Sequence, residues 1–518
     1  MQHRKDGGDD VMSPTELPSE IFYNLIGEYR HTHWPDHISS DTLERMCLAL
    51  SNRTVSGQLA FQYALCVLYK AIIHISRWLR SCSSQALSNC LERSRKSYIT
   101  TSLRYLSDID FTRSPSLPMI QAFLSGASLV QLLGQTSRSW FLTSLASRGL
   151  VALGYHQSTP MFLGSEERSE VRECVYWCYY MDKTLSMLLV RPSSLPDLSF
   201  NPATLVKPES KNPLSYKVKI MVQLAHVQDL YLKALAERQN DRPYPSSLVE
   251  SLQVELYAVR LKILEVRPKY NNTPMLESEW DAVDFTYFSI ACTALRLDSI
   301  LLHYHKKRQE CVQCARNALR AMQQCHTYVS STSNTTPDSL FWTVLLYPLT
   351  PFFVIFCNIV ATSDVDDLKL LKEATVTVAS IGENFSFSMN LHGLLSQLIK
   401  LCSQLEVPLK QTSTTKFGED QSNGKVPELL NNPHAVMPEE SEKDQNSRLT
   451  TTFGQAAEVD ANTDPQMENL SSSQFSDQDG SRRNSIWDDG LLWDFFNIQP
   501  SVEWFDAGYD SLIDGPLD

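Results

Sequence analysis

The first candidate for a metal site in this 518-residue chain is a pair of cysteines at Cys-x-x-Cys spacing, Cys311 and Cys314. Cys325 and His326 follow them, and thiolate and imidazole groups are the ligands that zinc prefers. A zinc site would need a second pair at a workable spacing. However, the three cysteines share one helical stripe with small apolar residues. We therefore expect a row of small residues facing a core, and we predict no metal and no other cofactor.

A second candidate is Asp182, a carboxylate on the apolar stripe of a predicted helix. A buried carboxylate needs a cation or several hydrogen-bond donors, and Arg191 and Arg148 are the nearest cations by topology. Catalysis would need a second carboxylate, a histidine or a nucleophile at recognisable spacing. None is found, and the chain has no nucleophile-elbow, phosphate-binding or zinc-protease motif. The sequence predicts a structural ion pair and no enzyme.

The elements that position these residues are predicted to be helices. Residues 20–410 contain nine glycines, about a third of average usage, and no Asn-Gly or Asp-Gly hairpin signal. Apolar residues follow helical spacing instead, as at Leu252, Leu256, Val259, Ile263 and Val266. The predicted fold class is all-α, with a large helical regulatory domain followed by a disordered acidic tail.

Three successive helices are expected in the centre of the chain. Gly134 should close the first, and the second should begin at an N-cap residue, Thr136 or Ser137, and stop at Gly154. The third should start at Ser165 as its N-cap and end just before residue 192, a proline. Between residues 171 and 190 it is apolar almost all round, which predicts that it is buried.

One segment, Leu340–Ser363, has no charge over 24 residues and is long enough to span a bilayer. Pro348 and Pro351 interrupt it, and no basic cluster flanks it. We interpret it as a kinked, buried helix and expect no membrane partner, with a membrane-associated protein as an alternative. The N-terminus has no apolar signal segment, so the 12 cysteines are expected to be reduced thiols in the cytosol or nucleus.

The acidity of the chain is confined to its C-terminal part. Residues 411–518 carry 21 acids and 6 bases, so their net charge is −15, whereas residues 1–410 have a net charge of +2. Residues 411–486 lack Trp, Tyr and Cys and are rich in polar residues, which predicts a disordered linker. Residues 1–16 are predicted to be disordered as well. Within SRRNS, Ser485 follows two arginines and resembles a site for a basophilic kinase.

The central block of the chain resembles the middle homology region of fungal zinc-cluster transcription factors. The likeness rests on RSWFLTSLASRGLVALGYH and EVRECVYWCYYMDKTLSMLLVRPSSLPD, with weaker matches at LPSEIFYNLIGEYRHTHWP and LFWTVLLYPLTPFFVIFCNIV. It covers roughly residues 17 to 405. Val190 stands where the family usually has Gly, and the spacing from Trp to Asp is one residue short. The matching motif residues are Tyr176, Trp177, Tyr180, Asp182, Lys183, Ser186, Arg191 and Pro192.

The resemblance implies a nuclear transcriptional regulator whose all-α regulatory domain covers residues 17–410. Fungal regulators of this type control metabolic or specialised-metabolite gene sets. The family's DNA-binding module has six cysteines in two Cys-x2-Cys-x6-Cys halves, and this sequence contains no such spacing. We therefore expect the chain to act through a DNA-bound partner, unless its gene lost the zinc cluster or was incompletely annotated. Direct DNA binding by this chain alone is not supported.

The resemblance also gives a meaning to residues 487–518, where acids are interleaved with aromatic residues and no Lys or Arg occurs. Such a segment is typical of an acidic activation segment, whose rings dock into apolar grooves of a coactivator or of the transcription machinery. The alternative is a helix that packs back on its own domain. A rival for the whole chain is an α-helical enzyme or ligand-binding protein with unrecognised site residues. The residues expected to make the activating contacts are Trp487, Leu491, Leu492, Trp493, Phe495, Phe496, Trp504 and Phe505.

Overall fold

The computed structural model describes residues 36–157, 165–208, 214–239, 246–270, 274–297, 305–332, 346–347, 350–381 and 386–411. Within these ranges it contains thirteen α-helices, one short 3-10 helix and no strand, which confirms the all-α prediction. Residues 1–35 and 412–518 lie outside the described residues. The predicted disordered N-terminus, linker and activation segment therefore stay predictions, as do the domain boundaries.

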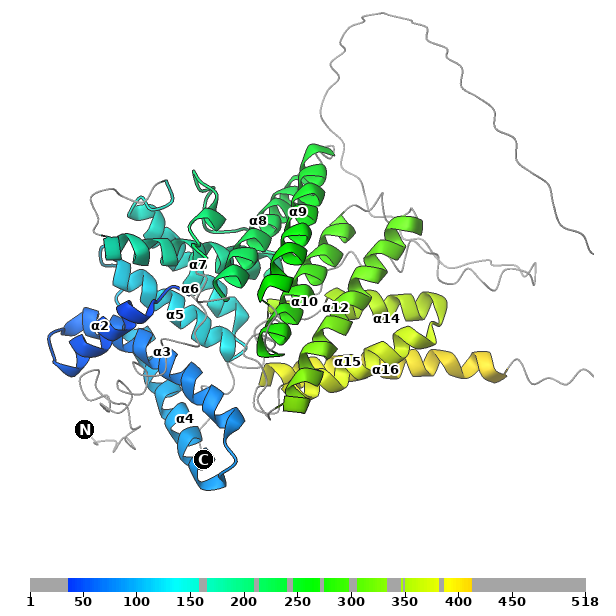
Figure 1. The fold of residues 1–518 in the computed structure, drawn as a ribbon, viewed down its shortest axis with the longest axis horizontal. Helices are drawn as coiled ribbons and strands as arrows, with labels where there is room; N and C mark the ends of the chain where they lie inside the picture. The colour runs from blue at the N-terminus through cyan, green and yellow to red at the C-terminus, as the bar shows by residue number, and fades with distance from the viewer. Residues whose placement is uncertain are drawn as a thin grey trace, which may run out of the picture. The chain divides into compact units, whose positions relative to one another are not determined.

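Figure 1 labels the helices in their order along the chain. They are α2 (Ser40–Ser51), α3 (Gly57–Ser81), α4 (Gln85–Asp108), α5 (Leu117–Leu132), α6 (Thr136–Ala152), α7 (Ser165–Leu189), η1 (Pro202–Thr204), α8 (Leu214–Gln239), α9 (Ser246–Tyr270), α10 (Pro274–Leu297), α12 (His305–Thr332), α14 (Thr350–Thr362), α15 (Val365–Ile381) and α16 (Ser386–Gln411).

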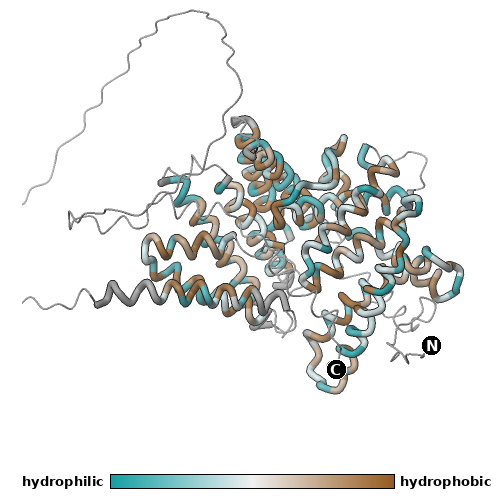
Figure 2. The backbone as a smooth tube through the Cα atoms, turned by 180° about the vertical axis from the view of Figure 1, so that it is seen from behind, coloured by the Kyte–Doolittle hydropathy of each residue, from teal (hydrophilic) through white to brown (hydrophobic). Residues whose placement is uncertain are grey.

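Neighbours in sequence are mostly neighbours in space. The most extensive contacts join α10 to α12, α5 to α6 and α3 to α4, and α7 packs against both α6 and α8. Hydrophobic and hydrophilic residues are interspersed along the helices, as Figure 2 shows. The side chains that turn inward form one buried apolar cluster that extends from α2 to α16. Helix α5 is at its centre, because every residue from Met119 to Leu132 is buried.

The predicted helix ends at two glycines are confirmed. Gly134 and Gly154 have φ of 79° and 76°, in the left-handed region that favours glycine. The Gly134 N–H donates to Gln131 O, and the N–H of the following residue donates to Val130 O, which is the Schellman pattern. Helix α6 ends in the same way. The predicted N-cap at Thr136 or Ser137 is wrong, because the N-cap of α6 is Gln135, whose side chain makes no capping bond.

Helix α7 begins at Ser165, which is the first residue inside the helix rather than its cap, and it ends at Leu189. The predicted stop near residue 191 is thus confirmed to within two residues. The expected apolar stripe of α9 is confirmed as well, because all five of its residues are buried.

The apolar segment Leu340–Ser363 is described only in part. Its helix α14 has 13 residues, with Pro351 in the first turn, where proline is tolerated, so the described part has no proline kink. Thirteen residues are fewer than the roughly 20 that cross a bilayer. Among the described residues, one helix is long and apolar enough to cross a membrane, Gly57–Leu79, and 72% of its most apolar window is buried inside the fold.

Candidate functional site

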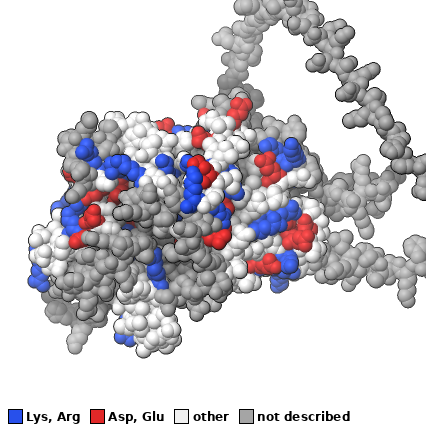
Figure 3. Space-filling model, viewed as in Figure 1, with Lys and Arg blue, Asp and Glu red and all other residues white. Residues whose placement is uncertain are grey.

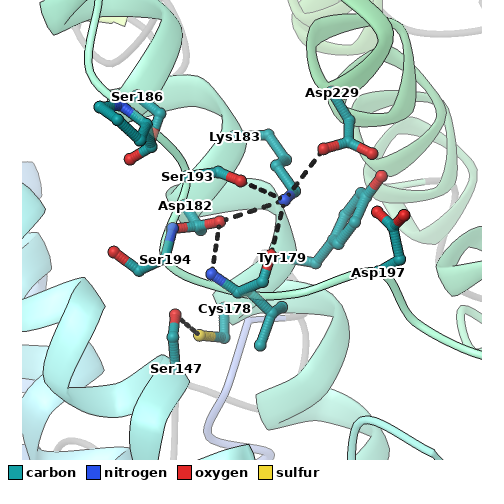
Figure 4. A network of polar contacts seen from close by, with 12 residues as sticks. Ser147, Cys178, Tyr179, Asp182, Lys183, Ser186, Ser193, Ser194, Asp197 and Asp229 are labelled. Carbon is teal, nitrogen blue, oxygen red and sulfur yellow. Dashed lines mark hydrogen bonds and ion pairs between the residues drawn. The ribbon is translucent and has the colours of Figure 1, made fainter. Parts of the chain in front are cut away.

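The carboxylate of Asp182 lies at the centre of a buried polar network on α7, which Figure 4 shows from close by. Its Oδ1 accepts a hydrogen bond from the backbone N–H of Ser194 at 2.8 Å, and its Oδ2 accepts one from Leu195 at 3.1 Å. Lys183 Nζ lies 3.4 Å from Oδ2. The predicted partners Arg191 and Arg148 are therefore wrong. Burial raises the pKa of Asp182, and the charge of Lys183 and the two N–H donors oppose this effect.

The ammonium group of Lys183 contacts α7, α8 and the segment that follows α7. Besides Asp182, it lies 3.0 Å from Asp229 Oδ1 of α8. It also donates to Ser193 Oγ at 2.8 Å and to Leu195 O at 2.9 Å. The side chain is 1% exposed. A buried ammonium group is tolerated only when it is paired and hydrogen-bonded. Here two carboxylates pair with it, and two neutral oxygens accept its hydrogen bonds.

This network continues from the interior to the surface. Asp229 also pairs with Lys233 at 3.1 Å, and Lys233 pairs with Asp197 at 2.7 Å. Asp197 is 73% exposed, so its bond with Lys233 is a surface pair of small energetic weight. The network therefore fixes residues 193–197 to α7 and α8, and its strongest contacts are the buried ones.

The end of α7 is closed by residues of the family-like motif. Val190 has φ of 54°, and the Arg191 N–H donates to Ser186 O at 2.9 Å, which completes the Schellman pattern seen at the glycines. The Arg191 guanidinium lies 4.9 Å from the ring centroid of Trp140 on α6. The Trp140 N–H donates to Ser186 Oγ at 3.1 Å, and Ser186 Oγ donates to Pro192 O at 3.4 Å. This part of the motif thus joins α6 to the end of α7.

Trp177, another residue of the predicted motif, lies in a second buried cluster. Its ring is 6.3 Å from that of His37, which precedes α2. His37 Nε2 lies 2.8 Å from Ser125 Oγ, and its Nδ1 is 3.9 Å from Asp36 Oδ1. Serine, histidine and aspartate are the residues of a hydrolase triad, so this cluster is the strongest candidate for the enzyme alternative.

The geometry of this second cluster fits a structural anchor better than a hydrolase triad. Asp36 is held by Lys70 at 2.5 Å, and its distance to the imidazole exceeds a hydrogen bond. His37 and Ser125 are 0% exposed, and burial lowers the pKa of His37 to about 4. Tyr176 donates to the Asp36 carbonyl at 3.2 Å. The cluster thus anchors the segment before α2 to α3, α5 and α7.

The cysteine stripe of α12 is buried as expected, with Cys311 and Cys325 at 0% exposure. Cys311 Sγ contacts Cys292 Sγ of α10 at 3.6 Å, and Cys314 is half-buried. No group of three or more His, Cys, Asp or Glu side chains in the described ranges is placed to hold a metal ion.

Charges of both signs are mixed on the face of the described surface that Figure 3 shows, without a broad field of one sign. Sequence-independent DNA binding depends on a broad field of positive charge.

The predicted phosphorylation site Ser485 and the eight predicted activation residues lie outside the described residues.

Asp182, Lys183 and the segment that they hold, residues 193–197, lie in a part of the chain that matches a known family, whereas Asp229 and Lys233 lie beyond that part. Residues 61–212 match the family described as "Fungal specific transcription factor domain". This part of the chain is therefore similar to a fungal-specific transcription factor domain. The matched region extends from α3 to the segment before α8, and it contains the predicted motif residues, among them Trp177, Asp182, Arg191 and Pro192.

A curated relative extends the similarity beyond that domain. It is an uncharacterized transcriptional regulatory protein of Schizosaccharomyces pombe, 24% identical over 359 residues, which cover 62% of this chain and 53% of the relative. The chain thus spans about half the length of the curated relative that it matches. No solved structure matches the chain.

Sequence reasoning identified Asp182 but missed the residues that hold it. Lys183 follows Asp182 directly, and adjacent helical residues point in different directions, so no pairing signal exists. Asp229 is 47 residues away on another helix, and the two N–H donors are backbone groups, which carry no sequence signal.

Proposed function

We propose that this chain regulates transcription in the nucleus, as an activator of a fungal metabolic or specialised-metabolite gene set. The observation that carries the proposal is the fungal-specific transcription factor domain at residues 61–212. The printed name of the Schizosaccharomyces pombe relative, a transcriptional regulatory protein, supports the same class of function. The acidic, aromatic composition of residues 487–518 supports the sign of regulation.

The helical domain is proposed to be a rigid regulatory scaffold. Each side chain of the Asp182–Lys183–Asp229 network is less than 10% exposed. These residues therefore stabilise the domain and leave no carboxylate of the network open to a substrate. The scaffold then presents other surfaces to partners. No cofactor is part of this proposal.

The C-terminal segment is proposed to make the activating contact. Trp493, Phe495 and Phe496 supply apolar contact area, and acids on either side repel one another and keep the rings in water until a coactivator groove accepts them. Phosphorylation of Ser485 would add about two negative charges beside this segment. We propose that the chain reaches its genes through a DNA-bound partner protein, because the sequence has no six-cysteine cluster.

A reporter assay tests this function. Residues 487–518, fused to an unrelated DNA-binding domain, should activate transcription, whereas residues 411–481 fused in the same way should not. Replacing Trp493, Phe495 and Phe496 with Ala should abolish activation. Replacing Asp488 and Asp489 with Asn, the matched control, should only reduce it, because a single charge is screened and replaceable. Undiminished activation by the triple variant would contradict the assignment.

A further inference from the structure

Two thiols meet where α10 packs against α12. Cys292 Sγ of α10 lies 3.6 Å from Cys311 Sγ of α12, and both side chains are 0% exposed. Cys292 Sγ also lies 3.7 Å from Cys311 O, and Cys311 Sγ lies 3.6 Å from Cys292 O. These contacts are weak, because a thiol is a poor hydrogen-bond donor. The two sulfur atoms therefore face each other directly across the helix pair.

The register of the two helices produces this sulfur contact. Helices α10 and α12 lie side by side and share the most extensive contacts of the described chain (Figure 1). Further along the pair, Ser278 Oγ of α10 lies 3.3 Å from Cys325 Sγ of α12. This second contact is two heptads away on both helices, at lower residue numbers on α10 and at higher numbers on α12, as expected for an antiparallel seam. Packing along the whole seam thus holds the two thiols together.

Cys292 is a better disulfide partner for Cys311 than Cys314 is, although Cys314 completes the Cys-x-x-Cys spacing. Residues three apart on a helix have Cβ atoms about 5–6 Å apart, whereas the Cβ atoms of a disulfide are about 3.5–4.5 Å apart. A bond between Cys311 and Cys314 would therefore distort α12. A bond between Cys292 and Cys311 needs only that their sulfur atoms approach from 3.6 Å to about 2 Å.

The position of the pair near two helix ends gives an oxidant a way in. Cys311 lies in the second turn of α12, which begins at His305, and Cys292 lies in the last two turns of α10, which ends at Leu297. Helix ends open more readily than the centres of packed helices. Burial raises the pKa of Cys292, and the charge of Arg296 opposes this effect. Because only the thiolate is nucleophilic, oxidation of the closed fold is slow and proceeds during local opening.

We propose that Cys292 and Cys311 are a redox site, which hydrogen peroxide oxidises to a disulfide between α10 and α12. One thiolate attacks an oxygen of the peroxide, the O–O bond breaks, and hydroxide leaves, which yields a sulfenic acid. The second thiolate attacks that sulfur, the S–O bond breaks, and a second hydroxide leaves. The two thiols lose two protons and two electrons in total, and the peroxide becomes two water molecules.

The disulfide fixes a seam on which other helices rest, because α12 also packs against α14 and α15. It closes the loop between positions 292 and 311, which restricts the unfolded chain and stabilises the fold. In a reducing compartment such bonds are transient and serve redox sensing. The site thus makes the helical domain responsive to peroxide, and this inference does not depend on the proposed activation segment.

Peptide mapping of the full chain without reductant tests this proposal. After treatment with hydrogen peroxide, a disulfide-linked peptide pair that contains Cys292 and Cys311 is expected within minutes to hours. Dithiothreitol should separate the pair. The oxidised chain should melt roughly 3–6 °C higher than the reduced chain. Cys292→Ser should abolish the cross-link and the rise in melting temperature, whereas the matched control Cys314→Ser should keep both.

A second variant tests the register of the helix pair. Ser278→Cys introduces a thiol opposite Cys325 at the equivalent position of the seam, and it should add a second cross-link under the same treatment. Oxidation of the exposed Cys90 that leaves Cys292 and Cys311 as thiols would overturn the proposal. So would a disulfide between Cys311 and Cys314, or a cross-link that forms only in denaturant. If Cys292→Ser does not fold, the map of the wild-type chain still decides between these outcomes.

Discussion

Replacing Asp182 with Ala should destabilise the domain by removing an acceptor from two backbone donors. The N–H groups of Ser194 and Leu195 both donate to this carboxylate, and Leu195 is 2% exposed. Leaving a buried donor without an acceptor costs about 1–3 kcal/mol. Loss of two such bonds is partly offset, because burial of the carboxylate is itself unfavourable and raises its pKa.

Loss of the ion pair with Lys183 adds less to this free-energy cost than the loss of a partner usually costs a buried charge. Stripping a buried charge of its partner costs about 3–5 kcal/mol. Lys183, however, keeps Asp229 at 3.0 Å and two neutral oxygens when Asp182 is lost. We therefore expect a net loss of about 2–4 kcal/mol, or roughly 3–6 °C in melting temperature for a domain of this size. Asp182→Asn keeps one acceptor oxygen and should cost about half as much.

The control for this variant is Asp197→Ala, the same chemical change at an exposed position of the segment that Asp182 holds. Asp197 is 73% exposed, and its surface pair with Lys233 is worth at most about 1 kcal/mol. Thermal unfolding and hydrogen exchange of the full chain should separate the two. The amides of Ser194 and Leu195 should lose protection in Asp182→Ala and keep it in Asp197→Ala. Equal melting temperatures, or unchanged protection of both amides, would refute this account of the network.

Three further predictions follow from other parts of the described chain. Val190→Gly should raise the free energy of unfolding by about 1 kcal/mol, because its left-handed φ of 54° strains a β-branched residue; a decrease in chemical denaturation would contradict this. Burial raises the pKa of Glu173 to about 8, so stability should fall as pH rises from about 4.5 to 8. Glu173→Gln should flatten that slope of melting temperature against pH and raise stability at pH 8; an unchanged slope would show that Glu173 does not cause it. Lys217→Met should cost about 3–5 kcal/mol, because it leaves the carboxylate of Glu279 buried without its cation, and Glu279→Gln in addition should restore most of the loss; a cost under about 1 kcal/mol would argue against a charged pair.

The parts of the fold that depend on local spacing could be predicted from the sequence. The buried stripe of α9 follows from steps of three and four residues, and the ends of α5 and α6 follow from glycines that take up positive φ. Cys311 and Cys325 turn inward for the same reason of helical spacing. These features need only the residues within one or two turns.

The features that could not be predicted depend on contacts between distant segments. The pairing of Lys183 with Asp229 depends on α7 lying beside α8. Lys183 also donates to Leu195 O, and this acceptor comes within reach only because the segment after α7 turns back toward the helix. The N-cap of α6 was placed wrongly because Thr136 has the residue type of a cap, although it is itself fully buried as the first residue of the helix. The motif departure at Val190 was visible in the sequence, but its positive φ was not.

Rapid depletion of the chain from living cells, followed by measurement of nascent RNA, tests the central claim most directly. A transcriptional activator should affect synthesis of its target RNAs before any secondary effect of growth. We expect a defined set of nascent transcripts to fall within minutes of depletion, and to recover when the wild-type chain is resupplied. The chain with Trp493, Phe495 and Phe496 replaced by Ala should not restore them. Unchanged nascent transcription after depletion would contradict the claim that this chain regulates transcription.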